Sequence, residues 1–146
     1  MREGPLRILF VCYGNICRSP IAVGIARALY DGAVQAESAG IAPVGDRPSE
    51  ESVLVIRTLY NQDILDHKPR QVAAAGPGEY DFVIAMDLDV YERLKASGAV
   101  PEDKLYAWDV ADPIGRGIEA YFAAADKIRD RLDQFLANRS LGGGRR

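Results

Sequence analysis

A ten-residue stretch near the N-terminus, VCYGNICRSP at positions 11–20, constrains the fold more than any other part of the chain. It follows an apolar run of strand length at residues 6–11 and precedes an Ala-rich run of helical periodicity at residues 21–30. A strand, a short loop and a helix are therefore predicted in succession. Five residues separate Cys12 from Arg18, so both side chains belong to this one loop.

The composition of the loop predicts an anion-binding site. Gly14 and Asn15 suit backbone positions with φ > 0, which allow several N–H groups to turn inward. Ser19 and Pro20 suit the N-cap and the first position of the following helix. Inward amides and a helix N-terminus both attract an oxyanion, and the Arg18 guanidinium can hold two of its oxygens at once. We expect this anion to be phosphate.

The potential that attracts an anion also stabilises a thiolate, so we expect Cys12 to be ionised at neutral pH. A thiolate beneath a bound phosphorus atom is an attacking nucleophile. Ser19 can donate its hydroxyl to the sulfur and so help the thiolate to leave when a phosphocysteine intermediate breaks down. The residues thus predict covalent catalysis by Cys12.

The order of apolar runs and turn signals predicts an α/β fold. Strands are expected at residues 6–11, 34–41, 80–86 and 104–108, and helices at 21–30, 88–96, 118–137 and directly after Ser49. Strands that alternate with helices form a parallel sheet, here of four strands with helices on both faces. Ligands bind such sheets at the carboxyl ends of the strands, where Cys12 is expected.

Length and composition limit the classes of function. The 146 residues are expected to form a single domain, 1–146, with flexible tails at 1–5 and about 140–146. A net charge of −3 argues against nucleic-acid binding. There is no apolar run long enough to span a membrane and no signal peptide at the start, so a cytoplasmic location without membrane contact is expected.

Asp112 is the candidate proton donor. A phosphatase must protonate the departing alcohol or phenol, and a carboxylate on a loop can do so. The pair Asp112-Pro113 lies in the predicted loop 109–117. Because Asp-Pro pairs are also ordinary turn formers, spacing alone is weak evidence for this role.

The motif at residues 11–20 resembles the phosphate loop of the low-molecular-weight protein tyrosine phosphatases, in their bacterial form. The resemblance extends over about residues 6–137. It implies hydrolysis of phosphotyrosine in proteins or peptides through a phosphocysteine intermediate, without a metal or other cofactor. Cys12 would be the nucleophile, and Asp112 the general acid and then the base that activates water. Phosphate or a similar oxyanion would be held by Tyr13, Gly14, Asn15, Ile16, Cys17 and Arg18.

The resemblance also assigns supporting residues and shows departures. Ser38 and His67 match residues that hydrogen-bond around the loop asparagine, here Asn15. The family commonly has an aromatic residue after Asp-Pro, as a wall for the phenyl ring, whereas this chain has Ile114. A second wall falls near Val44, so the slot for an aromatic ring is expected to be shallower than usual.

Three other functions remain open. Some bacterial relatives are arginine phosphatases, which resemble this chain but have Thr in place of Ile16. Arsenate reductases share the loop, although the thioredoxin-coupled ones use further cysteines and this chain has none after Cys17. A passive phosphate-binding module is the third. Cys17 is either a small packing residue or the partner of Cys12 in a reversible disulfide.

Overall fold

The structure is a computed structural model in which residues 4–139 are described. The tail predicted at residues 140–146 lies outside the described residues, as do the first three residues of the tail predicted at 1–5.

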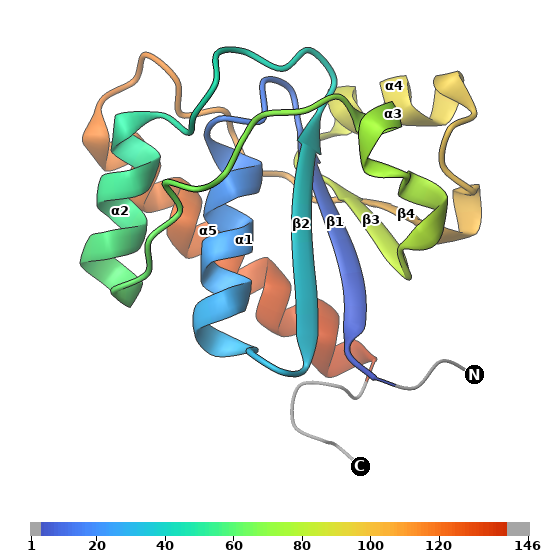
Figure 1. Cartoon of the computed structure of the whole chain (residues 1–146), viewed down its shortest axis with the longest axis horizontal. Coiled ribbons are helices and arrows are strands. Elements are labelled where there is room, and N and C mark those ends of the chain that lie inside the picture. The colour runs from blue at the N-terminus through green and yellow to red at the C-terminus, as the bar shows by residue number, and fades with distance from the viewer. Residues whose placement is uncertain (1–3, 140–146) are drawn as a thin grey trace.

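Four parallel strands form one sheet in the order β2-β1-β3-β4, which confirms the predicted fold class (Figure 1). The central strand β1 pairs with β2 on one side and with β3 on the other. The last residue pair between β1 and β2 is Cys12 opposite Gly40. The strand order reverses direction at β1, so a crevice is expected at its carboxyl end. The strands are β1 (Leu6–Cys12), β2 (Val34–Gly40), β3 (Phe82–Ala85) and β4 (Leu105–Ala107).

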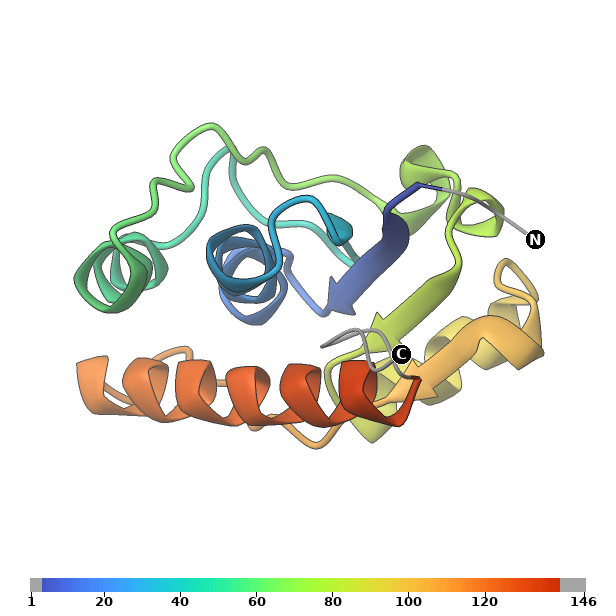
Figure 2. The same ribbon diagram turned by 90° about the horizontal axis from the view of Figure 1, so that it is seen from below.

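Both faces of β1 are buried, as expected for an interior parallel strand. Ile8 and Phe10 belong to the core shared with helices α1, α2 and α5, whereas Leu9 and Val11 belong to the core shared with α3 and α4. Figure 2 shows the long helix α5 beside α1 and α2. The helices are α1 (Arg18–Leu29), α2 (Glu50–Tyr60), α3 (Val72–Ala75), α4 (Leu88–Ser97) and α5 (Ile118–Asn138).

The start of α1 differs from the prediction. The helix begins at Arg18, with Cys17 at the N-cap and no side-chain cap. Ser19 and Pro20 thus lie inside the first turn, so their predicted assignment to the N-cap and first helical position was wrong. The Ser19 hydroxyl contacts Cys12 and Asn15 in place of capping the helix. A proline is tolerated there because first-turn N–H groups have no partner within the helix.

The other elements follow the prediction closely. Ser49 caps α2, as expected, and its hydroxyl accepts the Ser52 backbone N–H. Strand β3 is shorter than predicted. A 3₁₀ turn, η1 (Pro77–Glu79), lies before it along the chain, and another, η2 (Glu102–Lys104), precedes β4.

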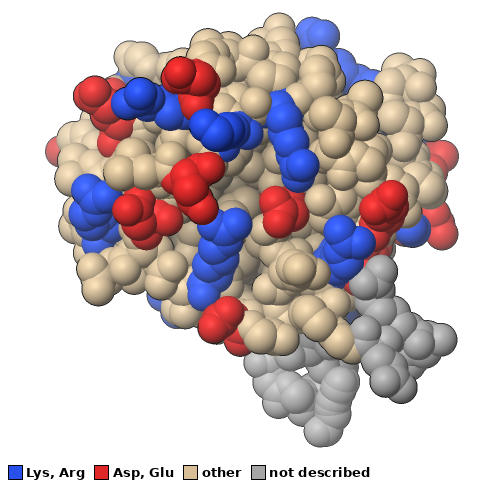
Figure 3. All heavy atoms as spheres, in the orientation of Figure 1, with Lys and Arg blue, Asp and Glu red and all other residues tan. Residues whose placement is uncertain are grey.

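Acidic and basic side chains are interspersed over the face seen in Figure 1, without a continuous basic area (Figure 3). Within residues 4–139, no helix has the length and apolar character needed to cross a membrane.

Candidate active site

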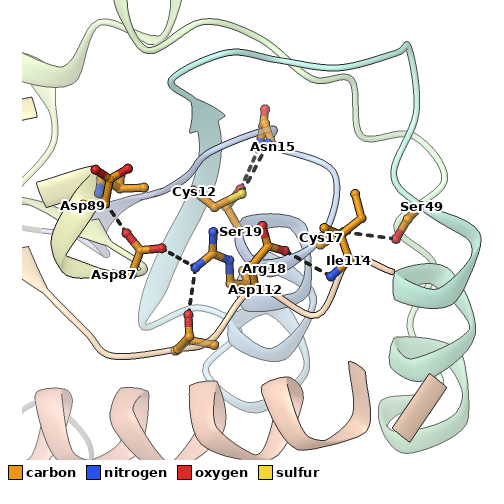
Figure 4. Close-up of polar contacts among 12 residues, drawn as sticks. Cys12, Asn15, Cys17, Arg18, Ser19, Ser49, Asp87, Asp89, Asp112 and Ile114 are labelled. Atoms are coloured by element: carbon orange, nitrogen blue, oxygen red, sulfur yellow. Dashed lines mark hydrogen bonds and ion pairs between the residues drawn. The ribbon is translucent and has the colours of Figure 1, made fainter. Parts of the chain in front are cut away.

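Cys12, the last residue of β1, lies at the floor of the loop that follows it. Its side chain is buried, with 2% of its surface exposed. The sulfur accepts the Asn15 backbone N–H at an N···S distance of 3.2 Å and lies 3.0 Å from Ser19 Oγ (Figure 4). Both groups can donate to a thiolate, the form of cysteine that acts as a nucleophile.

Asn15 gives the loop its one left-handed residue, with φ of 59°. Gly14 was also expected at φ > 0, and that expectation was wrong. A Cβ at Gly14 would lie at an ordinary contact distance of 3.4 Å from Val44. One left-handed residue is enough to turn the Asn15 N–H back towards the sulfur.

The side chain of Asn15 is fully buried and its orientation is fixed by hydrogen bonds. Its Oδ1 accepts the Arg70 backbone N–H at 2.9 Å, so Nδ2 faces the other way and donates to Ser19 Oγ at 2.8 Å and to Ser38 Oγ at 3.0 Å. Because Ser19 Oγ already accepts from Asn15, its own hydrogen is available to the Cys12 sulfur.

Ser38 and His67 both contact Asn15. Ser38 Oγ lies 3.3 Å from His67 Nδ1, and His67 Nε2 lies 2.8 Å from the Asn15 carbonyl oxygen. The hydroxyl that accepts from Asn15 can donate to Nδ1, which leaves Nε2–H to donate to the carbonyl. Burial lowers the pKa of His67 and so favours this neutral form.

Arg18 is almost completely buried and held from one side. Its Nη1 donates to Asp87 Oδ2 and to the Val110 carbonyl oxygen, each at 2.7 Å. The other Asp87 oxygen caps α4 by accepting the Val90 N–H. Since these contacts use Nη1, the edge formed by Nε and Nη2 is the part left for an oxyanion.

Asp112 lies at the mouth of the same cavity, on the loop between β4 and α5. Its Oδ2 is 3.7 Å from Arg18 Nη2, and its Oδ1 accepts the Ile114 N–H at 3.1 Å (Figure 4). The carboxylate is 46% exposed, so it can reach both solvent and the cavity.

The cavity above Cys12 has a volume of about 130 Å³. Its rim is apolar and half exposed, with Tyr13, Val44 and Ile114 each 43–53% exposed. Ile16 also lines it. The structure therefore brings together the loop residues, Asp112 and the two aliphatic residues, Val44 and Ile114, that stand where an aromatic wall was expected.

Cys17 contributes to the cavity wall, but its thiol points away into the core. The sulfur donates to Ser49 Oγ at 3.6 Å and lies 3.4 Å from Tyr121 Oη on α5. Burial raises the pKa of Cys17, which keeps this thiol protonated and unreactive.

Sequence reasoning missed two residues that shape the site. A Cβ on Gly40 would lie 2.8 Å from Asn15 Cβ and 2.9 Å from the Tyr13 carbonyl oxygen, so only glycine lets β2 approach the loop. The second residue is Asp87, whose contact with Arg18 was not foreseen. The signal was available in its position directly after β3, which ends beside β1.

No group of three or more His, Cys, Asp and Glu side chains among residues 4–139 is arranged to hold a metal ion.

Comparisons with known proteins agree over nearly the whole chain. Residues 7–142 match the family described as low molecular weight phosphotyrosine protein phosphatase. A probable low molecular weight protein-tyrosine-phosphatase, EpsP of Ralstonia nicotianae, is 29% identical over 92% of this chain and 97% of its own length. The protein-arginine-phosphatase of Geobacillus stearothermophilus is 31% identical over 89% of this chain and 93% of its own. The crystal structure of a low molecular weight protein tyrosine phosphatase from T. tengcongensis has a TM-score of 0.82 and 33% identity, covering 91% of this chain and 99% of that one. This chain belongs to the low molecular weight phosphotyrosine protein phosphatases, a family of hydrolases.

Proposed function

We propose that the protein hydrolyses phosphotyrosine in proteins or peptides through a phosphocysteine intermediate and without a metal ion. The observation that carries the proposal is the position of the Cys12 sulfur. It lies on the floor of a cavity, between two hydrogen-bond donors, with the Arg18 guanidinium and the Asp112 carboxylate lining the same space.

The chemistry needs two displacements at phosphorus. The Cys12 thiolate attacks and forms the P–S bond, while the P–O bond to the phenol breaks and Asp112 gives its proton to the departing oxygen. Asp112, now a carboxylate, takes a proton from water, whose oxygen attacks phosphorus. The P–S bond then breaks, and phosphate leaves. The Ser19 hydroxyl and the Asn15 N–H stabilise the sulfur that departs, and Arg18 stabilises the charge on the equatorial oxygens.

The apolar rim supports an aryl substrate. Tyr13, Val44 and Ile114 offer a contact surface for a phenyl ring above the cavity. A phenyl ring also carries the phosphate deep enough to reach the buried sulfur, whereas the short side chain of phosphoserine does not.

Two variants test the covalent mechanism. Cys12→Ser is expected to abolish turnover of an aryl phosphate. Asp112→Asn is expected to slow it by about 10²–10⁴-fold, the usual contribution of a general acid. Asp126→Asn on the exposed side of α5 is the matched control and should retain full turnover.

Mass spectrometry of a rapidly quenched reaction should find phosphate on the peptide that contains Cys12. Unchanged turnover in Cys12→Ser would contradict the proposed nucleophile. Loss of turnover when a metal chelator is added to the wild type would contradict the metal-independent mechanism.

A second experiment separates an enzyme from a passive phosphate-binding protein. Phenol and phosphate released from an aryl phosphate are measured under multiple-turnover conditions, with Cys12→Ser in parallel. An enzyme that uses Cys12 as its nucleophile should release many equivalents of both in the wild type and none in the variant. Binding of phosphate without release of phenol would favour a passive binder.

Phosphoarginine is the alternative substrate. Ile114 can contact a phenyl ring, but it is not the aromatic wall that the family commonly has, and this weakens the case for an aryl group. The arginine phosphatase of G. stearothermophilus is similar over most of the chain. Ile16 favours phosphotyrosine, since the arginine phosphatases are expected to have Thr there. Rates on phosphotyrosine and phosphoarginine peptides of one sequence decide between them. Ile16→Thr is expected to shift the ratio towards phosphoarginine.

A further inference from the structure

A second cavity, larger than the catalytic one, lies behind the phosphate loop. It has a volume of about 330 Å³, compared with about 130 Å³ above Cys12. We call it the side cavity. It is bounded by α1, by the end of β2 and by the segment 64–70.

The charged groups of the side cavity favour an anion. Three cations, Arg27, Lys68 and Arg70, face two carboxylates, Glu37 and Asp66. Glu37 is already engaged, with its Oε1 3.6 Å from Arg70 Nη2. Within residues 4–139, the side chains of Arg27 and Lys68 form no ion pair and donate no hydrogen bond. Arg27 and Lys68 can therefore both donate hydrogen bonds to an anion bound in the side cavity.

The size and floor of the side cavity indicate more than a bare ion. A volume of about 330 Å³ is within the range of small-molecule sites, of roughly 300–1,000 Å³. Its floor includes the buried side chains of Val23 and Ile64, which are 6% and 1% exposed. Basic and acidic side chains lie close together over this face of the molecule (Figure 3). A ligand with one phosphate group and a small polar body matches this arrangement.

We propose that the side cavity binds the phosphate group of a small phosphate monoester between Arg27 and Lys68, and that this ligand acts on the catalytic loop through Asn15.

The connection to the catalytic loop consists of three hydrogen bonds to one residue. Asn15 donates to Ser38 Oγ at 3.0 Å, accepts the Arg70 N–H at 2.9 Å through Oδ1, and accepts from His67 Nε2 at 2.8 Å through its carbonyl oxygen. All three partners line the side cavity. The Asn15 N–H in turn donates to the Cys12 sulfur at 3.2 Å. A ligand that shifts any of these partners therefore changes the environment of the nucleophile.

Ligand binding in the side cavity can be followed through the NMR signals of the His67 ring, because His67 is the only histidine in the chain. Its pKa is lowered by burial, further lowered by the charges of Arg70 and Arg27, and raised by Asp66 and by its bond to Asn15. Lys68 and Glu37 line the same cavity. An anion bound beside these groups stabilises the imidazolium, so the pKa of His67 should rise on binding.

The binding test uses full-length protein in which Cys12 has been carboxymethylated, so that the catalytic cavity is closed. Glycerol phosphate is titrated in at constant ionic strength, and the His67 ring protons are followed by NMR at several pH values. We expect a saturable change and a rise in the pKa of His67. Inorganic phosphate and unphosphorylated glycerol, tested in parallel, should bind more weakly.

Charge variants distinguish a site from a general salt effect. Arg27→Gln and Lys68→Gln are each expected to weaken glycerol phosphate binding about tenfold, because each removes one charged hydrogen bond. Lys104→Gln, beside the opposite edge strand β4, is the matched control and should bind as the wild type does. Absence of saturation, or equal binding in all three variants, would overturn the proposal, and tighter binding of inorganic phosphate would overturn the monoester assignment.

Coupling is tested separately with the unmodified enzyme. Glycerol phosphate should change kcat for an aryl phosphate by twofold or more, and Arg27→Gln should remove that change without altering kcat in its absence. A purely competitive effect on KM would place the ligand in the catalytic cavity and overturn the coupling. Because the binding test needs no turnover, it can fail while the proposed phosphatase function stands, and the reverse also holds.

Discussion

The Ser19 hydroxyl connects the asparagine of the loop to the nucleophile. It accepts from Asn15 Nδ2 at 2.8 Å and lies 3.0 Å from the Cys12 sulfur. The amide of Asn15 is itself oriented by the Arg70 N–H. The direction of the Ser19 hydrogen is thus set by a chain of groups that begins 55 residues away along the sequence, between Asn15 and Arg70.

Ser19→Ala is expected to slow breakdown of the phosphocysteine more than its formation, because the departing thiolate loses a donor. A hydrogen bond to a charged group contributes about 1.5–3 kcal/mol, which corresponds to roughly 10–100-fold in rate. Rapid-quench kinetics should show a burst of phenol release followed by a slower steady state than in the wild type. Ser97→Ala, at the end of α4, is the control. Equal slowing of both phases would contradict this role.

Gly40→Ala tests the close approach between β2 and the loop. The added Cβ would meet Asn15 Cβ at 2.8 Å and the Tyr13 carbonyl oxygen at 2.9 Å, and backbone cannot give way as a side chain can. We expect a loss of about 1–3 kcal/mol in the free energy of unfolding, with a larger relative loss of turnover. Gly78→Ala is the matched control, since its Cβ would meet nothing within 4 Å. Urea unfolding and turnover of an aryl phosphate measure the two effects, and similar values for both variants would contradict the argument.

The contacts that follow from the local sequence are those between residues close along the chain. Cys12, Arg18 and Ser19 lie within eight positions, so the succession of strand, loop and helix brings them together, although Ser19 lies inside the helix and not at its N-cap. The more distant Ser38 and His67 were expected near Asn15 only from the resemblance to the family. Gly40 and Asp87 depend on which strands lie beside β1, and the pattern of apolar runs does not specify strand order. The Gly14 error arose because glycine permits φ > 0 without requiring it.

At the scale of elements, the loop between β4 and α5 is held at both of its sides. Towards the cavity, the Val110 carbonyl oxygen accepts from Arg18 at 2.7 Å. Away from it, Asp109 accepts from Arg131 Nε at 3.0 Å and lies 3.2 Å from Lys127 Nζ, both on α5. These contacts lower the pKa of Asp109, first of all the bond from Arg131. Three residues after this anchor comes Asp112.

Asp109→Asn is expected to weaken the anchor and so misplace Asp112. Exposed ion pairs are weak, so the effect on turnover should be no more than roughly fivefold. It should appear with a poor leaving group such as phenyl phosphate and be absent with p-nitrophenyl phosphate, whose departure needs little protonation. Glu102→Gln, which breaks the exposed pair with Lys95, is the control. Equal slowing with both substrates would exclude a role in positioning the acid.

The order of elements was predictable for two reasons. Turn residues separate one apolar run from the next, and within each run the apolar residues recur with the spacing of either a strand or a helix. The helix expected after Ser49 and the strand expected from residue 34 both appear at those positions. The short helix α3 was not predicted. Four residues give too little periodicity to recognise, and Val72 of this helix is fixed by burial against the core on the α4 side.

At the scale of the whole molecule, His67 links three parts of the fold. Its ring contacts Ser38 on β2 and Asn15 in the loop after β1, while the residue itself lies on the segment between α2 and α3. The arrangement is satisfied by the neutral ring, and within the described residues every buried side-chain nitrogen and oxygen has a hydrogen-bond partner. Protonation of His67 would place a hydrogen on Nδ1, which then could no longer accept the hydrogen bond from Ser38, so it disrupts this network.

Because burial lowers the pKa of His67 in the folded protein, folding should lose stability as the solution is acidified. At pH values above the usual histidine pKa of about 6.5, both the folded and unfolded chains hold a neutral ring. As the pH falls below that value, the unfolded chain binds the proton first, and the free energy of unfolding decreases. The decrease stops once the pH is below the lowered pKa of the folded state, and its slope cannot exceed about 1.4 kcal/mol per pH unit for one group.

His67→Gln tests this dependence. The variant should be less stable than the wild type at pH 7.5, because it loses hydrogen bonds to Ser38 and Asn15. Since no other histidine is present, its free energy of unfolding should fall less between pH 7 and pH 5, so that the two proteins converge on acidification. Urea unfolding at several pH values gives both curves. Curves that stay parallel across this range would mean that the folded protein accepts the proton as readily as the unfolded chain does, and that the neutral ring is not what the network requires.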